Sequence, residues 1–102
     1  MIEIEAEKTG IRMEGHAGQA EKGQDIVCAG ASAILYALVY GLDQIGALDE
    51  CDLESGKAMV SAETGEDGEP TPEARGMLRM AVAGLDLITT KYPDYVHMQK
   101  FF

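Results

Sequence analysis

The apolar run from Ile26 to about Leu42 constrains the fold of this chain most. Its large side chains lie almost all round a helix, with alanines between them, at Ile26, Val27, Ile34, Leu35, Leu38, Val39 and Leu42. A helix with this pattern is expected to be buried on most sides. The chain has 102 residues, which suits one domain with one modest core. Residues 1–102 are therefore expected to form a single domain built on this helix.

Alternating or short apolar segments predict strands around that helix. Met1 to Glu7 alternates apolar and acidic residues, and the turn Lys8-Thr9-Gly10 leads into a second strand that ends at Gly15. A second hairpin is predicted from Ala47 to Glu54 and from Lys57 to Glu63, around Ser55-Gly56. A last strand is predicted from Tyr95 to Phe102.

A second helix is predicted from Thr71 to about Lys91. Thr71 is a good N-cap and Pro72 suits the first helical position. The expected apolar stripe consists of Met77, Ala81, Leu85 and Ile88, widened by Leu78 and Val82. The order β-β-α-β-β-α-β predicts an α+β, two-layer domain, in which one mostly antiparallel sheet carries both helices.

The stretch between the first hairpin and the first helix holds a histidine and a cysteine. His16 precedes Cys28 across a polar loop that contains Gly18 and Gly23. Asp25 is a good N-cap, so Cys28 would be the third helical residue, where the partial positive charge of a helix start favours a thiolate. A nearby imidazole would act in the same direction. The spacing alone leaves open a buried cysteine and a loop histidine that never meet.

The sequence of this stretch resembles that of the ribosomal-processing cysteine protease (Prp) family. The matching residues are Gly15, His16, Ala17, Gly23, Asp25, Ile26, Val27, Cys28, Ala29, Ser32 and Ala33, and the looser match continues to Tyr92-Pro93-x-Tyr95-Val96. The resemblance implies that Cys28 is the nucleophile and His16 its base. It also implies a cytoplasmic bacterial enzyme, acting as a homodimer, that removes the N-terminal extension of one large-subunit ribosomal protein, L27.

Five further residues are expected to support this site. They are Gly15, Gly18, Gly23, Asp25 and Ser32. Gly18 and Gly23 could be hinges of a loop that closes over bound peptide. Asp25 could orient His16, but capping the helix ranks first. Ser32 follows Cys28 by one turn, and its hydroxyl could instead bond the backbone carbonyl four residues earlier.

The other reactive side chains are expected to have no catalytic role. Cys51 lies in the second hairpin without a histidine or helix start nearby and is interpreted as a small structural residue. His97 is interpreted as a surface or sheet-edge histidine. His16, Cys28, Cys51 and His97 contain no paired spacing typical of zinc ligands, so no metal and no other cofactor is expected.

The net charge indicates which class of partner the protein can bind. Eighteen acidic and eight basic residues give a formal net charge of −10, which argues against direct nucleic-acid binding and suits a basic partner such as a ribosomal protein. A non-catalytic, acidic, dimeric binding module for such a partner is the alternative function. Two cysteines without a signal segment indicate free thiols in a reducing cytosol. No run approaches the ~20 apolar residues of a membrane span, so no membrane partner is expected.

The chain ends Gln99-Lys100-Phe101-Phe102. The preferred interpretation is that both phenylalanines close an edge strand by packing on the sheet. The alternative is a tail that visits a neighbouring active site, because it loosely echoes the product terminus of the family.

Overall fold

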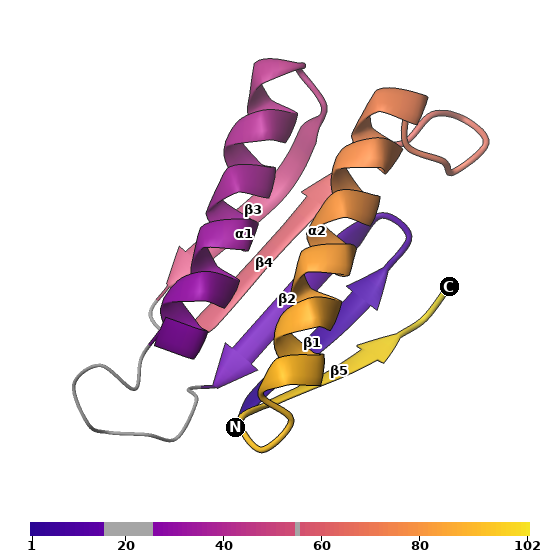
Figure 1. The fold of residues 1–102 in the computed structure, drawn as a ribbon. Coiled ribbons are helices and arrows are strands. Elements are labelled where there is room, and N and C mark those ends of the chain that lie inside the picture. The colour runs from indigo at the N-terminus through magenta and orange to yellow at the C-terminus, as the bar shows by residue number, and fades with distance from the viewer. Residues whose placement is uncertain (16–25, 55) are drawn as a thin grey trace.

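The computed structural model describes residues 1–15, 26–54 and 56–102, which form one five-stranded sheet with two helices (Figure 1). The elements are β1 (Ile2–Glu7), β2 (Gly10–Gly15), α1 (Ile26–Gln44), β3 (Leu48–Glu54), β4 (Lys57–Ala62), α2 (Pro72–Lys91) and β5 (Val96–Lys100). The strands lie in the order β3-β4-β2-β1-β5, and both helices cover the same face of the sheet (Figure 1). This arrangement confirms the predicted α+β fold and its order of elements.

The sheet is antiparallel except at one edge. β1 pairs with β2 and β2 with β4 in antiparallel register, whereas β5 runs parallel to β1 with Val96 opposite Ile2. The alternation predicted for β1 is present, because Ile2, Ile4 and Ala6 are buried beneath the helices while Glu3 and Glu7 are exposed. The backbone N–H of Ile2 donates to the carbonyl of Tyr95 over 2.8 Å and fixes where β5 begins.

The helix α1 is buried on one face only, so the expectation that it is covered on most sides is wrong. Its buried side chains are Val27, Ala31, Leu35, Leu38, Val39 and Leu42. Ile26, Tyr36 and Tyr40 are exposed by 60%, 47% and 66%. The physical reason is the two-layer architecture, because a helix packed on one sheet and one neighbouring helix keeps an uncovered outer side.

The two helices approach closely by placing glycines opposite large side chains. A Cβ on Gly84 would lie 2.9 Å from Cδ1 of Ile34, and a Cβ on Gly30 would lie 3.4 Å from Cδ1 of Ile88. Gly30 of α1 thus faces a side chain of α2, and Gly84 of α2 faces a side chain of α1. Glycine within a helix is unfavourable by about 1 kcal/mol relative to alanine, and this packing partly offsets that loss.

By length and composition alone, α1 could cross a membrane. Its most apolar window has a mean hydropathy of 1.7, and 33% of that window is buried inside the domain. The sequence expectation that no run reaches this range is therefore wrong. The observation is weak evidence for a span, because the core helix of a non-membrane protein passes the same test.

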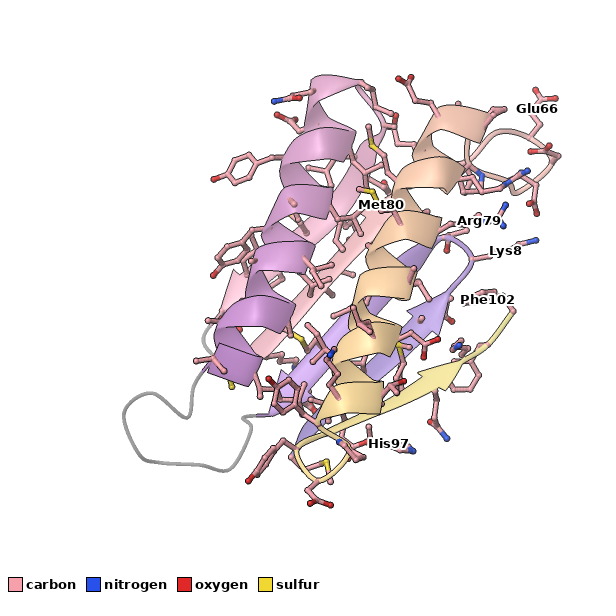
Figure 2. All side chains as sticks on the ribbon, in the orientation of Figure 1. Lys8, Glu66, Arg79, Met80, His97 and Phe102 are labelled. Atoms are coloured by element: carbon pink, nitrogen blue, oxygen red, sulfur yellow. The ribbon has the colours of Figure 1, made fainter. Side chains whose placement is uncertain are left out.

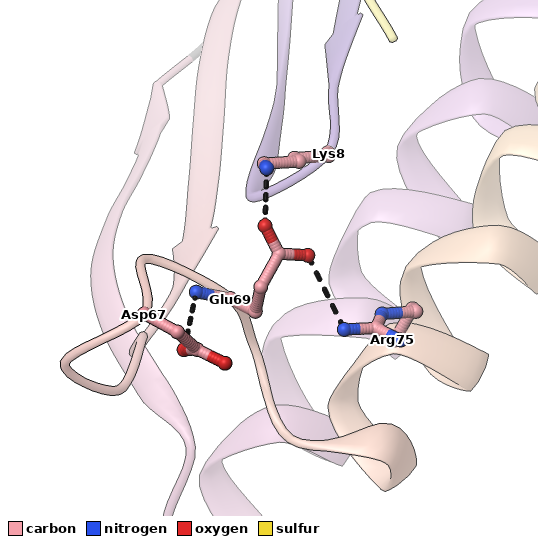
Figure 3. A network of polar contacts seen from close by, with 4 residues as sticks. All are labelled: Lys8, Asp67, Glu69 and Arg75. Atoms are coloured by element: carbon pink, nitrogen blue, oxygen red, sulfur yellow. Dashed lines mark hydrogen bonds and ion pairs between the residues drawn. The ribbon is translucent and has the colours of Figure 1, made fainter.

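The start of α2 is defined by side-chain hydrogen bonds. Thr71 Oγ1 accepts from the backbone N–H of Ala74 at 3.2 Å, which confirms the predicted N-cap, and Pro72 takes the first helical position. Glu69 pairs with Lys8 and, at 3.3 Å, with Arg75, and its N–H donates to Asp67 Oδ1 at 3.0 Å (Figure 3). This network attaches the loop before α2 to the turn between β1 and β2.

The apolar stripe of α2 is centred one position away from the prediction. Its buried residues are Ala74, Leu78, Ala81 and Leu85, while Met77, Val82 and Ile88 are partly buried at its margins. Leu78 therefore belongs to the centre rather than to the margin. Met77 and Ile88 instead face the glycines of α1, because a Cβ on Gly41 would lie 3.4 Å from Met77 Sδ.

The C-terminal phenylalanines do not pack on the sheet, so the preferred interpretation of this tail is wrong. β5 ends at Lys100, and Phe101 and Phe102 are exposed by 57% and 65%. The backbone N–H of Phe101 still donates to the carbonyl of Ala6 over 2.8 Å. Lys100 turns toward α2, where it pairs with Asp86 at 3.0 Å, and the chain leaves the sheet beside Arg79 and Lys8 (Figure 2).

Candidate active site

Cys28 lies where the sequence places it, at the third residue of α1. It is partly buried and packs against the hydrophobic core. The N–H groups of a helix's first turn have no partner within the helix, and the aligned peptide dipoles make this end partially positive. Cys28 therefore lies at the partially positive end of α1, in its first turn.

A cavity of about 290 Å³ opens beside Cys28. It is lined by Ile2, Met13, Gly15, Cys28, Ser32, Leu35, Tyr36, Leu53, Glu54, Gly56, Lys57 and Ala58. The sheet and α1 supply apolar side chains to the lining, and Glu54 and Lys57, on either side of the turn between β3 and β4, supply charged ones. Three predicted site residues, Gly15, Cys28 and Ser32, thus meet in one cavity although they come from two different elements.

Gly15 has a conformation and a neighbour that glycine alone tolerates well. Its φ is +101°, and a Cβ added there would lie 2.4 Å from the carbonyl oxygen of Met1. Its backbone N–H donates to the carbonyl of Gly56 over 2.8 Å, which joins the end of β2 to the turn between β3 and β4. Gly15 therefore allows the end of β2 to lie close to Met1 and to the turn between β3 and β4.

Four predicted site residues, His16, Gly18, Gly23 and Asp25, lie outside the described residues. The same holds for the proposed closure of the loop from Gly18 to Gly23. The described part of the site thus contains the cysteine, Ser32 and the glycine that ends β2.

The second cysteine and second histidine lie apart from this cavity. Cys51 is exposed in the edge strand β3 and does not line the cavity, and its interpretation as a structural residue stays a prediction. His97 is exposed on β5 and its Nδ1 lies 2.9 Å from Glu3 Oε1 (Figure 2 shows its place), which confirms a surface histidine. Within residues 1–15, 26–54 and 56–102, no three His, Cys, Asp or Glu side chains are grouped as metal ligands.

Sequence reasoning missed Tyr36, Glu54 and Lys57 as lining residues of the cavity. Tyr36 could have been found, because residues four apart share a helix face and Cys28, Ser32 and Tyr36 follow that spacing. Glu54 and Lys57 flank the predicted turn at Ser55-Gly56, but no local pattern indicates that this turn reaches the start of α1.

The chain matches known proteins over nearly all of its length. The family model described as cysteine protease Prp matches residues 1–97. The chain belongs to the cysteine protease Prp family. Its catalytic class is therefore that of a cysteine protease.

Individual relatives agree with this assignment. The ribosomal processing cysteine protease Prp of Staphylococcus aureus (strain Mu50) is 33% identical over 103 residues, which cover 95% of this chain and 91% of the relative. The protein of the same name from Mycoplasma genitalium is 29% identical over 96 residues, with 94% and 92% covered. A crystal structure of S. aureus Prp with a covalently linked product peptide is 24% identical in sequence and superposes with a TM-score of 0.82. The superposition covers 99% of this chain and 100% of that one, so the two proteins share a fold.

Proposed function

We propose that this protein removes the N-terminal extension of the large-subunit ribosomal protein L27, using Cys28 as nucleophile and His16 as its base. The observation that carries the proposal is the position of Cys28, in the first turn of α1 and on a cavity that Gly15 also lines. Membership of the cysteine protease Prp family supplies the class of substrate. Residues 1–102 are proposed to act as one protease domain.

The reaction would proceed by acyl transfer to sulfur. His16 takes the proton of the Cys28 thiol, and the thiolate Sγ attacks the carbonyl carbon of the scissile peptide bond. His16 then gives this proton to the leaving amine as the C–N bond breaks, leaving a thioester on Cys28. Water attacks the thioester while His16 accepts its proton, and the proton returns to the thiolate or to solvent as the carboxylate product leaves.

The oxyanion formed at each addition step requires hydrogen-bond donors. The backbone N–H of Cys28 is proposed as one donor, because the first-turn N–H groups of a helix point toward its N-terminal end. A backbone N–H from the segment 23–25 is proposed as the second. Asp25 is proposed to cap the helix, and Gly18 and Gly23 to act as hinges.

The lining of the cavity indicates which kind of substrate side chain binds next to the scissile bond. Ile2, Met13 and Leu35 line it with buried, apolar side chains, so an apolar side chain of the substrate would be removed from water there. Ser32 and Tyr36 place hydroxyl groups on the α1 side of the cavity. These hydroxyls are proposed to hydrogen-bond the substrate backbone.

We also propose a homodimer that forms through the outer side of the helical layer. An apolar groove of about 350 Å³ lies between the helices, lined by Ile34, Ala37, Leu38, Gly41, Met77, Met80, Ala81 and Gly84. Met80 and Leu87 on α2 are exposed by 74% and 56% (Figure 2 labels Met80). A second copy would cover this side, and a clean monomer at micromolar concentration in light scattering would contradict the proposal. A ribosomal-protein substrate makes the cytoplasm the proposed compartment.

Cleavage of the extended ribosomal protein tests the proposed function. The host's L27 precursor is incubated with the enzyme, and the products are read by mass spectrometry. We expect one cut that releases the N-terminal extension, lost in Cys28→Ser and in His16→Ala. The matched controls Cys51→Ser and His97→Ala should retain the cut. No cleavage by the wild-type protein, or cleavage by Cys28→Ser, would overturn the proposal.

A further inference from the structure

No described residue covers the face of the sheet opposite the helices, and this face is strongly acidic. The residues that face away from the helices include the carboxylates Glu3, Glu5, Glu7, Glu14, Glu50 and Asp52 and the cations Arg12 and Lys57. Arg12 lies 3.7 Å from Glu5, and His97 lies 2.9 Å from Glu3. The remaining carboxylates give this face a net negative field, which attracts a basic partner from a distance.

This acidic sheet face contains a hollow of about 390 Å³. The hollow is lined by Glu3, Glu5, Arg12, Glu14, Asp52, Lys57, Ala58 and Met59. Four of these are carboxylates, and Met59 supplies an apolar wall. A Lys or Arg side chain of a partner could pack its aliphatic part against Met59. Its charged group could then donate hydrogen bonds to the carboxylates.

One cross-strand pair on this face brings two like charges together. Glu3 lies directly opposite Glu14 in the pairing of β1 and β2. Like charges at directly opposed positions destabilise a sheet. This repulsion would be relieved by a cation bound between the two strands.

The acidic sheet face adjoins the cavity of Cys28 at the start of β4. Lys57 and Ala58 line both the hollow and that cavity. A substrate whose scissile bond lies beside Cys28 could therefore extend past the start of β4 onto the sheet.

We propose that the acidic sheet face binds the Lys- and Arg-rich body of the protein substrate while its N-terminal extension occupies the Cys28 cavity. This inference rests on the proposed function, because a ribosomal protein must carry cations that meet RNA phosphates. A nucleic acid would be repelled by this face, and so would the same face of a second copy of the chain. The binding gives a second contact beyond the cleaved segment and selects the whole precursor over a short peptide.

The test compares two substrates and two double variants. The substrates are the full-length L27 precursor and an uncharged peptide that spans only its cleavage site. The variant Glu14→Gln/Asp52→Asn neutralises two carboxylates of the hollow, neither of which forms an ion pair within the described part of the chain. The control Glu63→Gln/Glu66→Gln makes the same change of charge in the loop between β4 and α2 (Figure 2 labels Glu66).

The expected result is a change for one substrate only. In the hollow variant, kcat/KM for the full-length precursor falls about five-fold or more, while kcat/KM for the short peptide stays within two-fold. The control leaves both values unchanged. Added salt weakens the reaction of the full-length precursor with the wild-type and control enzymes and leaves the reaction of the short peptide unchanged. Equal losses in the two double variants, or an unchanged rate for the precursor in the hollow variant, would overturn the inference. A wild-type enzyme that cleaves neither substrate would overturn the proposed function instead, and the inference with it.

Discussion

Replacing Gly15 by alanine tests how the described part of the site is held together. Gly15 combines a φ of +101° with a position where a Cβ would lie 2.4 Å from the carbonyl oxygen of Met1. A non-glycine residue in the left-handed backbone conformation destabilises the folded protein by about 1–2 kcal/mol. Forcing an extra methyl group against packed atoms adds about 1–3 kcal/mol. We therefore expect Gly15→Ala to lower the free energy of unfolding by roughly 3 kcal/mol.

Gly46 offers a matched control, because it has a φ of +70° but no atom within 4 Å of an added Cβ. Gly46→Ala should lower the free energy of unfolding by about 1 kcal/mol, which is the penalty of the left-handed backbone alone. Chemical denaturation measures both values, and thermal denaturation should show a difference in Tm of roughly 10 °C. A Gly15→Ala protein as stable as Gly46→Ala would refute the account of this strand end.

Three further substitutions test the packing and the N-cap of α2, and each is checked by denaturant unfolding. Leu85 is fully buried, while Leu87 is 56% exposed on the side proposed for the dimer. At a concentration where the protein is monomeric, Leu85→Ala should therefore lower the free energy of unfolding by about 2–5 kcal/mol, and Leu87→Ala by less than about 0.5 kcal/mol. Similar losses for the two would contradict the assigned buried face. Thr71→Ala removes the acceptor of the Ala74 N–H and should lose about 1 kcal/mol, whereas no loss would mean that the cap contributes nothing.

Most elements could be predicted because their signals are local. Alternation in Ile2, Ile4 and Ala6 predicts β1, and Thr71 with Pro72 predicts the start of α2; the structure confirms both. The coverage of α1 could not be predicted, since an apolar helix surface is the same in sequence whether a sheet, a neighbouring helix or a second subunit meets it. The position of Phe101 and Phe102 depends on where β5 separates from β1, which no local pattern specifies.

The site was predictable in part for the same reason. Cys28 at a helix start follows from the apolar run that begins at Ile26. The contribution of Glu54, Gly56 and Lys57 to the cavity depends on the order of strands, which brings the turn between β3 and β4 beside the end of β2. Strand order is set by contacts between residues far apart in sequence, so no short motif contains it.

The alkylation of the two cysteines tests the central claim most directly, because exposure and chemistry give opposite expectations. Cys51 is exposed and Cys28 only partly exposed, so accessibility alone favours reaction at Cys51. The nucleophile assignment requires the reverse order, since the thiolate is the reacting form. With substoichiometric iodoacetamide at pH 7 and peptide mapping, we expect the label on Cys28 first, and proteolytic activity lost in proportion to it. Reaction at Cys51 first, or full activity after complete modification of Cys28, would contradict the assignment.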